Sequence, residues 1–123
     1  MSKERTAIGA FGERIAAGHL RRAGYDIVAT NVPVRPFGEI DIVAKQDDVV
    51  ILVEVRTRRG DRFGGAAWSI TPTKQRRMLR AATAYLAMVD DDHLSARIDV
   101  VFVNLDARGR LIGIEHIENA VEG

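Results

Sequence analysis

The chain has 123 residues, 46% of them hydrophobic and 28% charged, and a formal net charge of +1. This length predicts one folded domain (residues 1–123), and this composition excludes a disordered chain. Uninterrupted apolar runs such as Val49 to Val53 are far too short for a membrane span, and the first residues lack the apolar segment of a secretory signal. The absence of cysteine excludes disulfides and thiolate metal sites and fits a cytoplasmic protein.

The first half of the chain predicts a helix followed by three strands. Hydrophobic residues recur at helical spacing from about Thr6 to Ala23, and Gly24 stands where a C-cap glycine is expected. Tyr25 to Val32 predicts a first strand. The segments 38–45 and 49–58 predict the next two, joined by a polar turn at 46–48.

The second half predicts a loop, a helix and two further strands. Residues 59–69 hold three glycines and predict the loop, and a helix then starts with Thr71 as N-cap and Pro72 as its first residue. It ends in the acidic run 90–92, before strands at 97–105 and 111–117. The resulting fold class is α/β, with a mixed five-stranded sheet in the order αβββαββ and flanking helices. The strand that contains Val49 to Val53 shows no alternation and is placed centrally.

Positive charge is concentrated in residues 55–89. This segment holds eight basic residues and one acid, a net +7, whereas the rest of the chain carries −6. Such asymmetry favours a surface that faces a polyanion, and a solvated basic face without a partner is the alternative. The basic segment adjoins two unusual carboxylates, which favours the first interpretation.

Asp41 and Glu54 interrupt hydrophobic strands and require a reason to be there. Glu54 ends a buried apolar run, where an unpaired charge is costly, and aspartate is depleted in strands. If the chain reverses in a two-residue loop, Gln46 pairs with Val49 and Asp41 lies opposite Glu54 on one face. The other face then holds only Ile40, Ile42, Val53 and Val55. A three-residue loop would instead put Asp41 and Glu54 on opposite faces.

Two facing carboxylates predict a divalent-cation site. Unless something compensates their repulsion, one of them is protonated or the pair holds a cation. An all-oxygen site with few protein ligands suits Mg²⁺ or Mn²⁺ and a phosphate-containing substrate. The alternative, equal in weight on spacing alone, is that Arg56 and Arg58 pair with the acids in surface salt bridges.

Five sequence blocks together resemble a known family. GEIDIVA at 38–44 and VEVRTR at 53–58 are similar to the active-site core of restriction-endonuclease-like nucleases. With GAFGE at 9–13, TKQRR at 73–77 and RIDVV at 97–101, the set resembles the YraN-like family of uncharacterised bacterial proteins, from Gly9 to about Asn119. The resemblance implies a restriction-endonuclease-like fold and a metal-dependent phosphodiesterase similar to archaeal Holliday-junction resolvases. Analogy with those resolvases also suggests a homodimer.

The resemblance assigns roles to residues of the core. It implies that Glu13 is the acid of the first helix, that Asp41 and Glu54 are the metal ligands, and that Val55 lends its carbonyl oxygen. Arg56 occupies the position of the usual lysine, and because it stays protonated it stabilises charge but does not act as a base. For Glu13 the alternative is a favourable interaction with the helix dipole.

The second helix supplies the predicted contacts to nucleic acid. Lys74, Arg76 and Arg77 oppose the dipole at the helix start, and such a group of cations attracts phosphate. Gln75 is predicted to orient a water or a phosphate, and Arg58 to contact nucleic acid from the neighbouring strand. Lys74 is also a candidate amine for the site. Phe63 and Trp68, beside two loop glycines, are candidates for base stacking or for packing. The three histidines and Asp99 are interpreted as structural, with Asp99 paired to a nearby arginine.

These features predict an Mg²⁺- or Mn²⁺-dependent endonuclease-like protein that binds nucleic acid, DNA favoured over RNA, branched DNA included. A metal-activated water would attack a backbone phosphate while Arg56 and the helix cations stabilise charge. The alternatives are a non-catalytic nucleic-acid-binding protein of the same fold and a protein-interaction module. Asp41→Asn separates them, because binding survives that change and cleavage does not.

Overall fold

The structure, a computed structural model, describes residues 7–60, 70–89 and 95–121. In chain order the described elements are α1 (Ala7–Arg22), β1 (Asp26–Pro33), β2 (Glu39–Gln46), β3 (Val49–Arg59), α2 (Pro72–Val89), β4 (Ser95–Leu105) and β5 (Leu111–Val121). This is the predicted order αβββαββ, and the α/β fold class of the restriction-endonuclease-like resemblance is confirmed. Of the predicted loop at 59–69, Arg59 is instead the last residue of β3 and Gly60 follows it with a φ of 107°. Residues 61–69, with the other two glycines, Phe63 and Trp68, lie outside the described residues, as do the acidic run 90–92 and His93.

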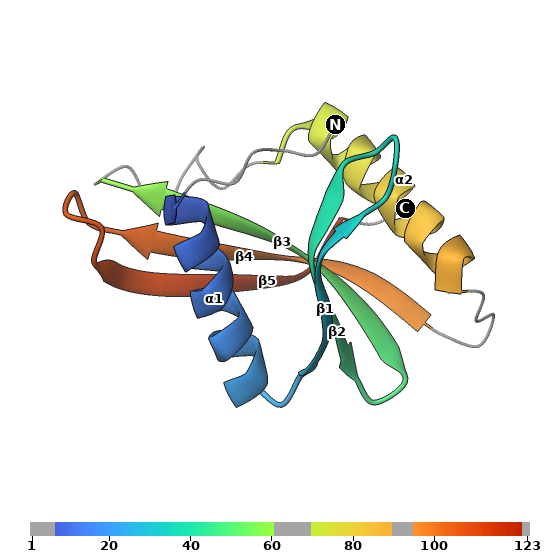
Figure 1. The fold of residues 1–123 in the computed structure, drawn as a ribbon, viewed down its shortest axis with the longest axis horizontal. Coiled ribbons are helices and arrows are strands. Elements are labelled where there is room, and N and C mark those ends of the chain that lie inside the picture. The colour runs from blue at the N-terminus through green and yellow to red at the C-terminus, as the bar shows by residue number, and fades with distance from the viewer. Residues whose placement is uncertain (1–6, 61–69, 90–94, 122–123) are drawn as a thin grey trace.

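The five strands form one mixed sheet in the spatial order β1-β2-β3-β4-β5. Neighbouring strands are antiparallel except β3 and β4, which are parallel and are joined by the crossover through α2. β3 is the central strand, as the lack of alternation predicts, and it pairs with β4 over its whole length. Figure 1 shows α1 on one side of the twisted sheet and α2 on the other.

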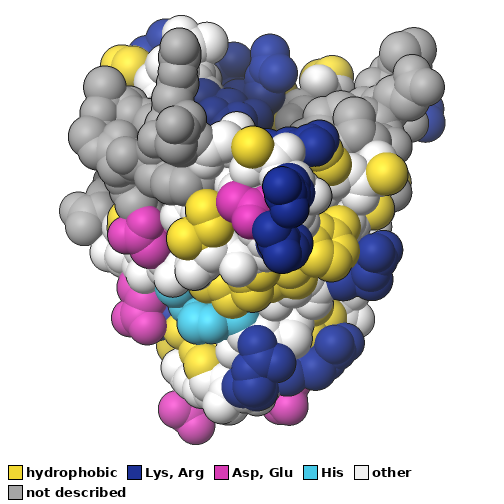
Figure 2. Space-filling view, turned by 90° about the vertical axis from the view of Figure 1, so that its left-hand side faces the viewer, with side chains coloured by type: hydrophobic (Ala, Val, Ile, Leu, Met, Phe, Trp, Pro, Cys, Tyr) yellow, Lys and Arg dark blue, Asp and Glu magenta, His cyan; other side chains and the backbone are white. Residues whose placement is uncertain are grey.

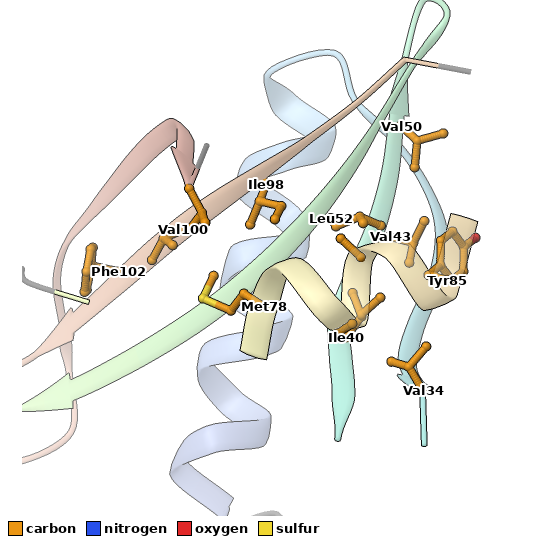
Figure 3. Packing of buried hydrophobic residues seen from close by; sticks show 13 residues of the cluster. Val34, Ile40, Val43, Val50, Leu52, Met78, Tyr85, Ile98, Val100 and Phe102 are labelled. Carbon is orange, nitrogen blue, oxygen red and sulfur yellow. The ribbon is translucent and has the colours of Figure 1, made fainter. Parts of the chain in front are cut away.

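Each helix covers one hydrophobic face of the sheet. On the α2 side, Met78 and Tyr85 pack against Val43, Leu52 and Val100 (Figure 3). On the α1 side, a second cluster joins the buried face of α1 to alternate residues of the strands. Its α1 members include Ala16, Ala17 and Leu20, and its strand members include Ile42, Ile51, Val53, Val55, Val101 and Val103. Because the two clusters lie on opposite faces, successive β3 residues alternate between the two helices.

The end of α1 and the start of α2 lie at the capping residues that the sequence predicts. Gly24 has a φ of 93°, and the Tyr25 N–H donates to the carbonyl of Leu20, so α1 ends in a left-handed C-cap. At the start of α2 the Lys74 N–H donates to Thr71 Oγ1 over 3.2 Å, and Pro72 is the first helical residue. The predicted N-cap and C-cap are therefore confirmed.

The β2–β3 hairpin has the predicted two-residue turn. Gln46 pairs with Val49, and the same register continues to the pair Ile42–Val53. Asp47 adopts a φ of 54°, the left-handed conformation that a tight hairpin turn requires. The alternative three-residue loop is excluded.

Candidate metal and nucleic-acid site

The sheet forks where β2 and β3 stop pairing. Their ladder runs from the turn to the pair Ile42–Val53, but β3 continues along β4 as far as Arg59. On the other side, Glu39 and Ile40 at the start of β2 pair with β1 instead. Figure 1 shows the β1–β2 hairpin bending away from the far half of β3. The gap between the two strands opens at Asp41.

Asp41 lies at the apex of this fork. It is only 4% exposed, and its Oδ2 accepts a hydrogen bond of 2.8 Å from the backbone N–H of Val55. The carboxylate thus takes the place of a strand carbonyl at the point where the ladder ends. A charge-assisted bond of this kind offsets part of the cost of burying the carboxylate and fixes its orientation.

The predicted apolar face of the hairpin is wrong at Ile40. Ile42, Val53 and Val55 pack on the α1 side as expected, but Ile40 packs on the α2 side with Val43 and Leu52 (Figure 3). The alternation therefore breaks between Ile40 and Ile42. The physical reason is the fork, because β2 no longer follows the pleat of β3 once the two strands separate. Asp41 consequently points to the backbone edge of β3 rather than sharing a regular face with Glu54.

Glu54 projects from β3 toward α2. Its side chain is 12% exposed, and Oε2 lies 3.3 Å from Nζ of Lys74. The predicted alternative paired the acids with Arg56 and Arg58, but the cation beside Glu54 is Lys74. The predicted metal ligand and the candidate amine therefore lie together. They share a small hollow of about 50 Å³ with Glu39 and Arg77, over a floor that includes Leu52 and Met78.

Arg56 and Arg58 follow Glu54 on the same face of β3. Arg56 is half-buried beside Phe102 of β4 in the parallel register. Arg58 donates from Nε to Asn104 Oδ1 over 3.1 Å, and its guanidinium lies 4.3 Å from the ring centroid of Phe102. Burial, with the charge of Arg56, lowers the pKa of Arg58 below its ordinary value. Arg58 is thus anchored on the sheet rather than extended from it.

Glu13, on the α1 side of the sheet, is connected to the fork by a hydrogen bond with Asn31, a residue that the sequence analysis did not single out. Asn31 donates from Nδ2 to Glu13 Oε1 over 3.0 Å. It lies between the β1–β2 pairs Thr30–Ile42 and Val32–Ile40, level with Asp41, and has a φ of 52°. The sequence signal for this backbone conformation was the residue type, because asparagine tolerates the left-handed conformation better than most residues.

Gly12 allows α1 to approach β3 closely enough to hold Glu13 in this place. A Cβ at Gly12 would lie 1.8 Å from Oγ1 of Thr57. Only glycine fits such an approach, so the glycine of the GAFGE block has a packing role next to the predicted acid.

The remaining predicted contacts at the start of α2 have different surroundings. Arg76 and Arg77 are exposed, and Arg76 donates to Thr73 Oγ1 over 3.2 Å. Gln75 donates from Nε2 to the Ile70 carbonyl over 2.7 Å, so its amide ties the start of α2 to the chain that enters it. Figure 2 shows lysine and arginine side chains in separate groups on one side of the molecule, with hydrophobic and acidic side chains between them.

Asp99 is the centre of a second polar cluster, on the α1 side of the sheet. It is fully buried and accepts from Arg97 Nε over 2.9 Å and from the Asn119 N–H over 2.9 Å, and its Oδ2 lies 2.7 Å from His116 Nε2. Burial alone would raise the pKa of Asp99, but these hydrogen bonds outweigh it and hold the pKa below its ordinary value. The predicted pairing of Asp99 with an arginine is confirmed. The Asn119 bond also extends β5 through a bulge to Val121, four residues beyond its predicted end.

The donor set at the fork fits a hydrated hard cation. In the part of the chain that the structure describes, no three histidine, cysteine or acidic side chains gather into a metal-binding group. Mg²⁺ commonly uses only one or two protein carboxylates and completes its shell with water and phosphate oxygens. Asp41 and Glu54, with a buried and a nearly buried carboxylate at one fork, match that requirement.

Fold and site together define a class, a small α/β domain with acidic residues at a sheet fork and cations on the adjoining helix. Within that class the chain belongs to the uncharacterised protein family UPF0102, whose family model matches residues 12–103. The family resemblance drawn from the five blocks is confirmed. Neither described helix has the length and hydrophobicity of a membrane span.

Relatives in this family extend over nearly the whole chain. A UPF0102 protein of Roseiflexus castenholzii is 45% identical and covers 99% of this chain and 98% of its own length. One of Syntrophotalea carbinolica is 43% identical over 99% and 97%, and one of Mycolicibacterium vanbaalenii is 40% identical over 95% of each chain.

Proposed function

We propose that this protein is a metal-dependent endonuclease that hydrolyses phosphodiester bonds of nucleic acid, DNA in preference to RNA. The observation that carries the proposal is the buried Asp41 carboxylate, which the Val55 N–H fixes at the fork; the residue before Val55 is Glu54, whose carboxylate lies beside Lys74. A carboxylate placed there has little structural advantage over an apolar residue unless it binds something. Asp41 and Glu54 would hold Mg²⁺ or Mn²⁺. When bound, the ion would supply Lewis-acid stabilisation of phosphodiester charge and make water more acidic.

The chain's own cations would bind and orient the substrate. Arg56 stays protonated, so it would orient a phosphate and stabilise developing charge but not accept a proton. Arg56 stands where a lysine is usual, and Lys74 would supply the missing amine. Its Nζ lies 3.3 Å from Glu54, so the amine is at the site. Arg76 and Arg77, exposed on the first turns of α2, would hold the backbone beyond the reacting phosphate. Glu13, held by Asn31, would add a negative group from α1.

A cleavage panel tests this proposal. Single-stranded, duplex, flap and four-way-junction DNA, and RNA, are incubated with the full chain and Mg²⁺ or Mn²⁺. We expect metal-dependent cutting of at least one substrate and its loss in Asp41→Asn. The matched control is Asp48→Asn, the same change at an exposed residue of the same hairpin, which is expected to keep activity. No cutting of any substrate, together with no Mn²⁺ bound by calorimetry, would reject the proposal.

A non-catalytic nucleic-acid-binding protein of the same fold is the second candidate. The observation that favours it is the Lys74 ammonium at Glu54, because a cation already at the carboxylate competes with a metal ion, and Arg56 supplies no base. This candidate predicts nucleic-acid affinity that falls steeply with salt and survives Asp41→Asn. Binding without cutting in the same panel would select it.

A further inference from the structure

An open hollow of about 410 Å³ lies between α1 and β1, on the side of the sheet away from α2. Its polar lining consists of Glu13, Arg14, Arg21, Thr30 and Asn31, over two alanines of α1. Arg14, Arg21 and Thr30 are exposed. The site proposed above uses only Glu13 and Asn31 from this group, so the two guanidinium groups have no role in it.

The hollow begins at the fork. Asn31 lies on β1 at the level of Asp41, and neighbouring strands are about 4.8 Å apart. Glu13, on the rim, is bound to Asn31 over 3.0 Å. A chain that leaves the fork on this side therefore passes directly into the hollow.

The lining suits a sugar–phosphate backbone. Guanidinium groups match phosphate oxygens in geometry as well as charge, and the Thr30 hydroxyl and Asn31 amide add neutral donors. Arg14 and Arg21 lie two helical turns apart, roughly 10.5 Å along the axis. That separation lets the two guanidinium groups contact different phosphates of one strand. The single acid, Glu13, accepts the Asn31 amide, so its charge is partly compensated at the rim.

The helices α1 and α2, which carry these two groups of cations, lie on opposite sides of the sheet (Figure 1). A nucleic acid that contacts both groups must turn sharply at the fork. Duplex DNA is stiff over about 150 base pairs, so such a turn is costly for a duplex and easy for a single strand. The sharp turn therefore selects a flexible strand.

We propose that the α1–β1 hollow binds the backbone of a single-stranded segment that leaves the fork, with Arg14 and Arg21 on its phosphates. This inference rests on the proposed function, because it extends the same site. It adds a second substrate-binding region and the class of substrate, a nucleic acid with an unpaired strand.

Binding in EDTA tests the inference separately from turnover. Fluorescence anisotropy measures the affinity of the full chain for a single strand of roughly 20 nucleotides, long enough to reach both helices, and for the matching duplex. The variant Arg14→Gln/Arg21→Gln is compared with Arg108→Gln/Arg110→Gln, which removes the same charge from the exposed β4–β5 turn. Thr30→Trp fills the hollow without a change of charge. Circular dichroism verifies that each variant is folded.

Loss of two phosphate contacts lowers the salt slope of single-strand binding by about 1.4, which corresponds to about 20-fold weaker binding at 0.1 M salt. We expect this loss in Arg14→Gln/Arg21→Gln, weaker single-strand binding in Thr30→Trp, and little change in the control or in duplex binding. Equal losses in the control, equal losses for the duplex, or no loss in the first variant would overturn the inference while the proposed function stands. A parent chain that binds no nucleic acid in EDTA would overturn the inference, and the proposed function would fall with it only if the cleavage panel and Mn²⁺ calorimetry were negative as well.

Discussion

Replacing Gly12 by alanine is expected to displace α1, the helix that carries Glu13, from its close packing on β3. The new Cβ would lie 1.8 Å from Thr57 Oγ1, 2.9 Å from its Cβ and 3.1 Å from its Cγ2. Rotating the threonine side chain relieves only part of this overlap, because its Cβ belongs to the central strand and does not move with χ1. Backbone must therefore shift, and overpacking of this kind costs about 1–3 kcal/mol.

Helix propensity opposes that cost and sets the net value. Alanine in place of glycine stabilises a helix interior by about 1 kcal/mol. With an overlap at the severe end of the range, we expect Gly12→Ala to lower the free energy of unfolding by about 2 kcal/mol. With an m-value of about 2 kcal/mol per molar urea, the midpoint of urea unfolding moves down by about 1 M.

Gly18 provides the matched control in the same helix. A Cβ there would meet the guanidinium group of Arg22, with Nη1 nearest at 3.3 Å, and this is the far end of a flexible side chain. Gly18→Ala is therefore expected to raise the midpoint. Adding Thr57→Ala to Gly12→Ala removes the contacts with Oγ1 and Cγ2 but leaves the 2.9 Å contact with Cβ, so it restores part of the loss. A Gly12→Ala protein as stable as Gly18→Ala would refute the close packing of α1 on β3.

Three further outcomes follow from the polar contacts. Asp99→Asn leaves Arg97 and His116 without their buried carboxylate and is expected to cost about 3 kcal/mol in urea unfolding, against little for the exposed Asp48→Asn. Burial, with the charges of His116 and Arg22, lowers the pKa of His19 below its ordinary value. The unfolded chain therefore binds more protons than the folded protein, and the free energy of unfolding falls as the pH drops below about 6.5. His19→Gln is expected to remove that part of the pH dependence of the urea midpoint. Lys74→Gln removes the ammonium beside Glu54 and is expected to tighten Mn²⁺ binding by up to about fivefold in calorimetry, whereas Arg76→Gln leaves it unchanged; equal affinity in both variants would contradict the competition between Lys74 and metal.

Features set by neighbouring residues were predictable from the sequence. The two-residue turn at Asp47, the N-cap at Thr71 and the C-cap at Gly24 each depend on a few adjacent positions, and all three are confirmed. The central place of β3 was predictable too, because burial on both faces removes its alternation. The predicted β2–β3 register also holds as far as the pair Ile42–Val53, but it ends before the predicted pairing of Asp41 with Glu54.

Features that depend on distant residues were not predictable. Ile40 was placed on the wrong face because the fork arises from β2 turning toward β1, which no local pattern encodes. The extension of β5 depends on Asp99 binding the N–H of Asn119, a residue with a φ of 52° that ordinarily signals a strand end. The rings of His19 and His116 lie 5.5 Å apart, between residues almost a hundred positions apart in the chain.

Contacts from both helices converge on the fork. Asp41 is fixed by Val55, Glu54 lies beside Lys74 of α2, and Glu13 of α1 is held by Asn31. Gly12 seats α1 on the same strand, β3, that carries Val55 and Glu54. A change at Gly12 or Asn31 therefore reaches the carboxylates through one strand or one hydrogen bond. If the fork binds metal, such changes should weaken Mn²⁺ binding in proportion to their effect on α1, even though neither residue bears a charge.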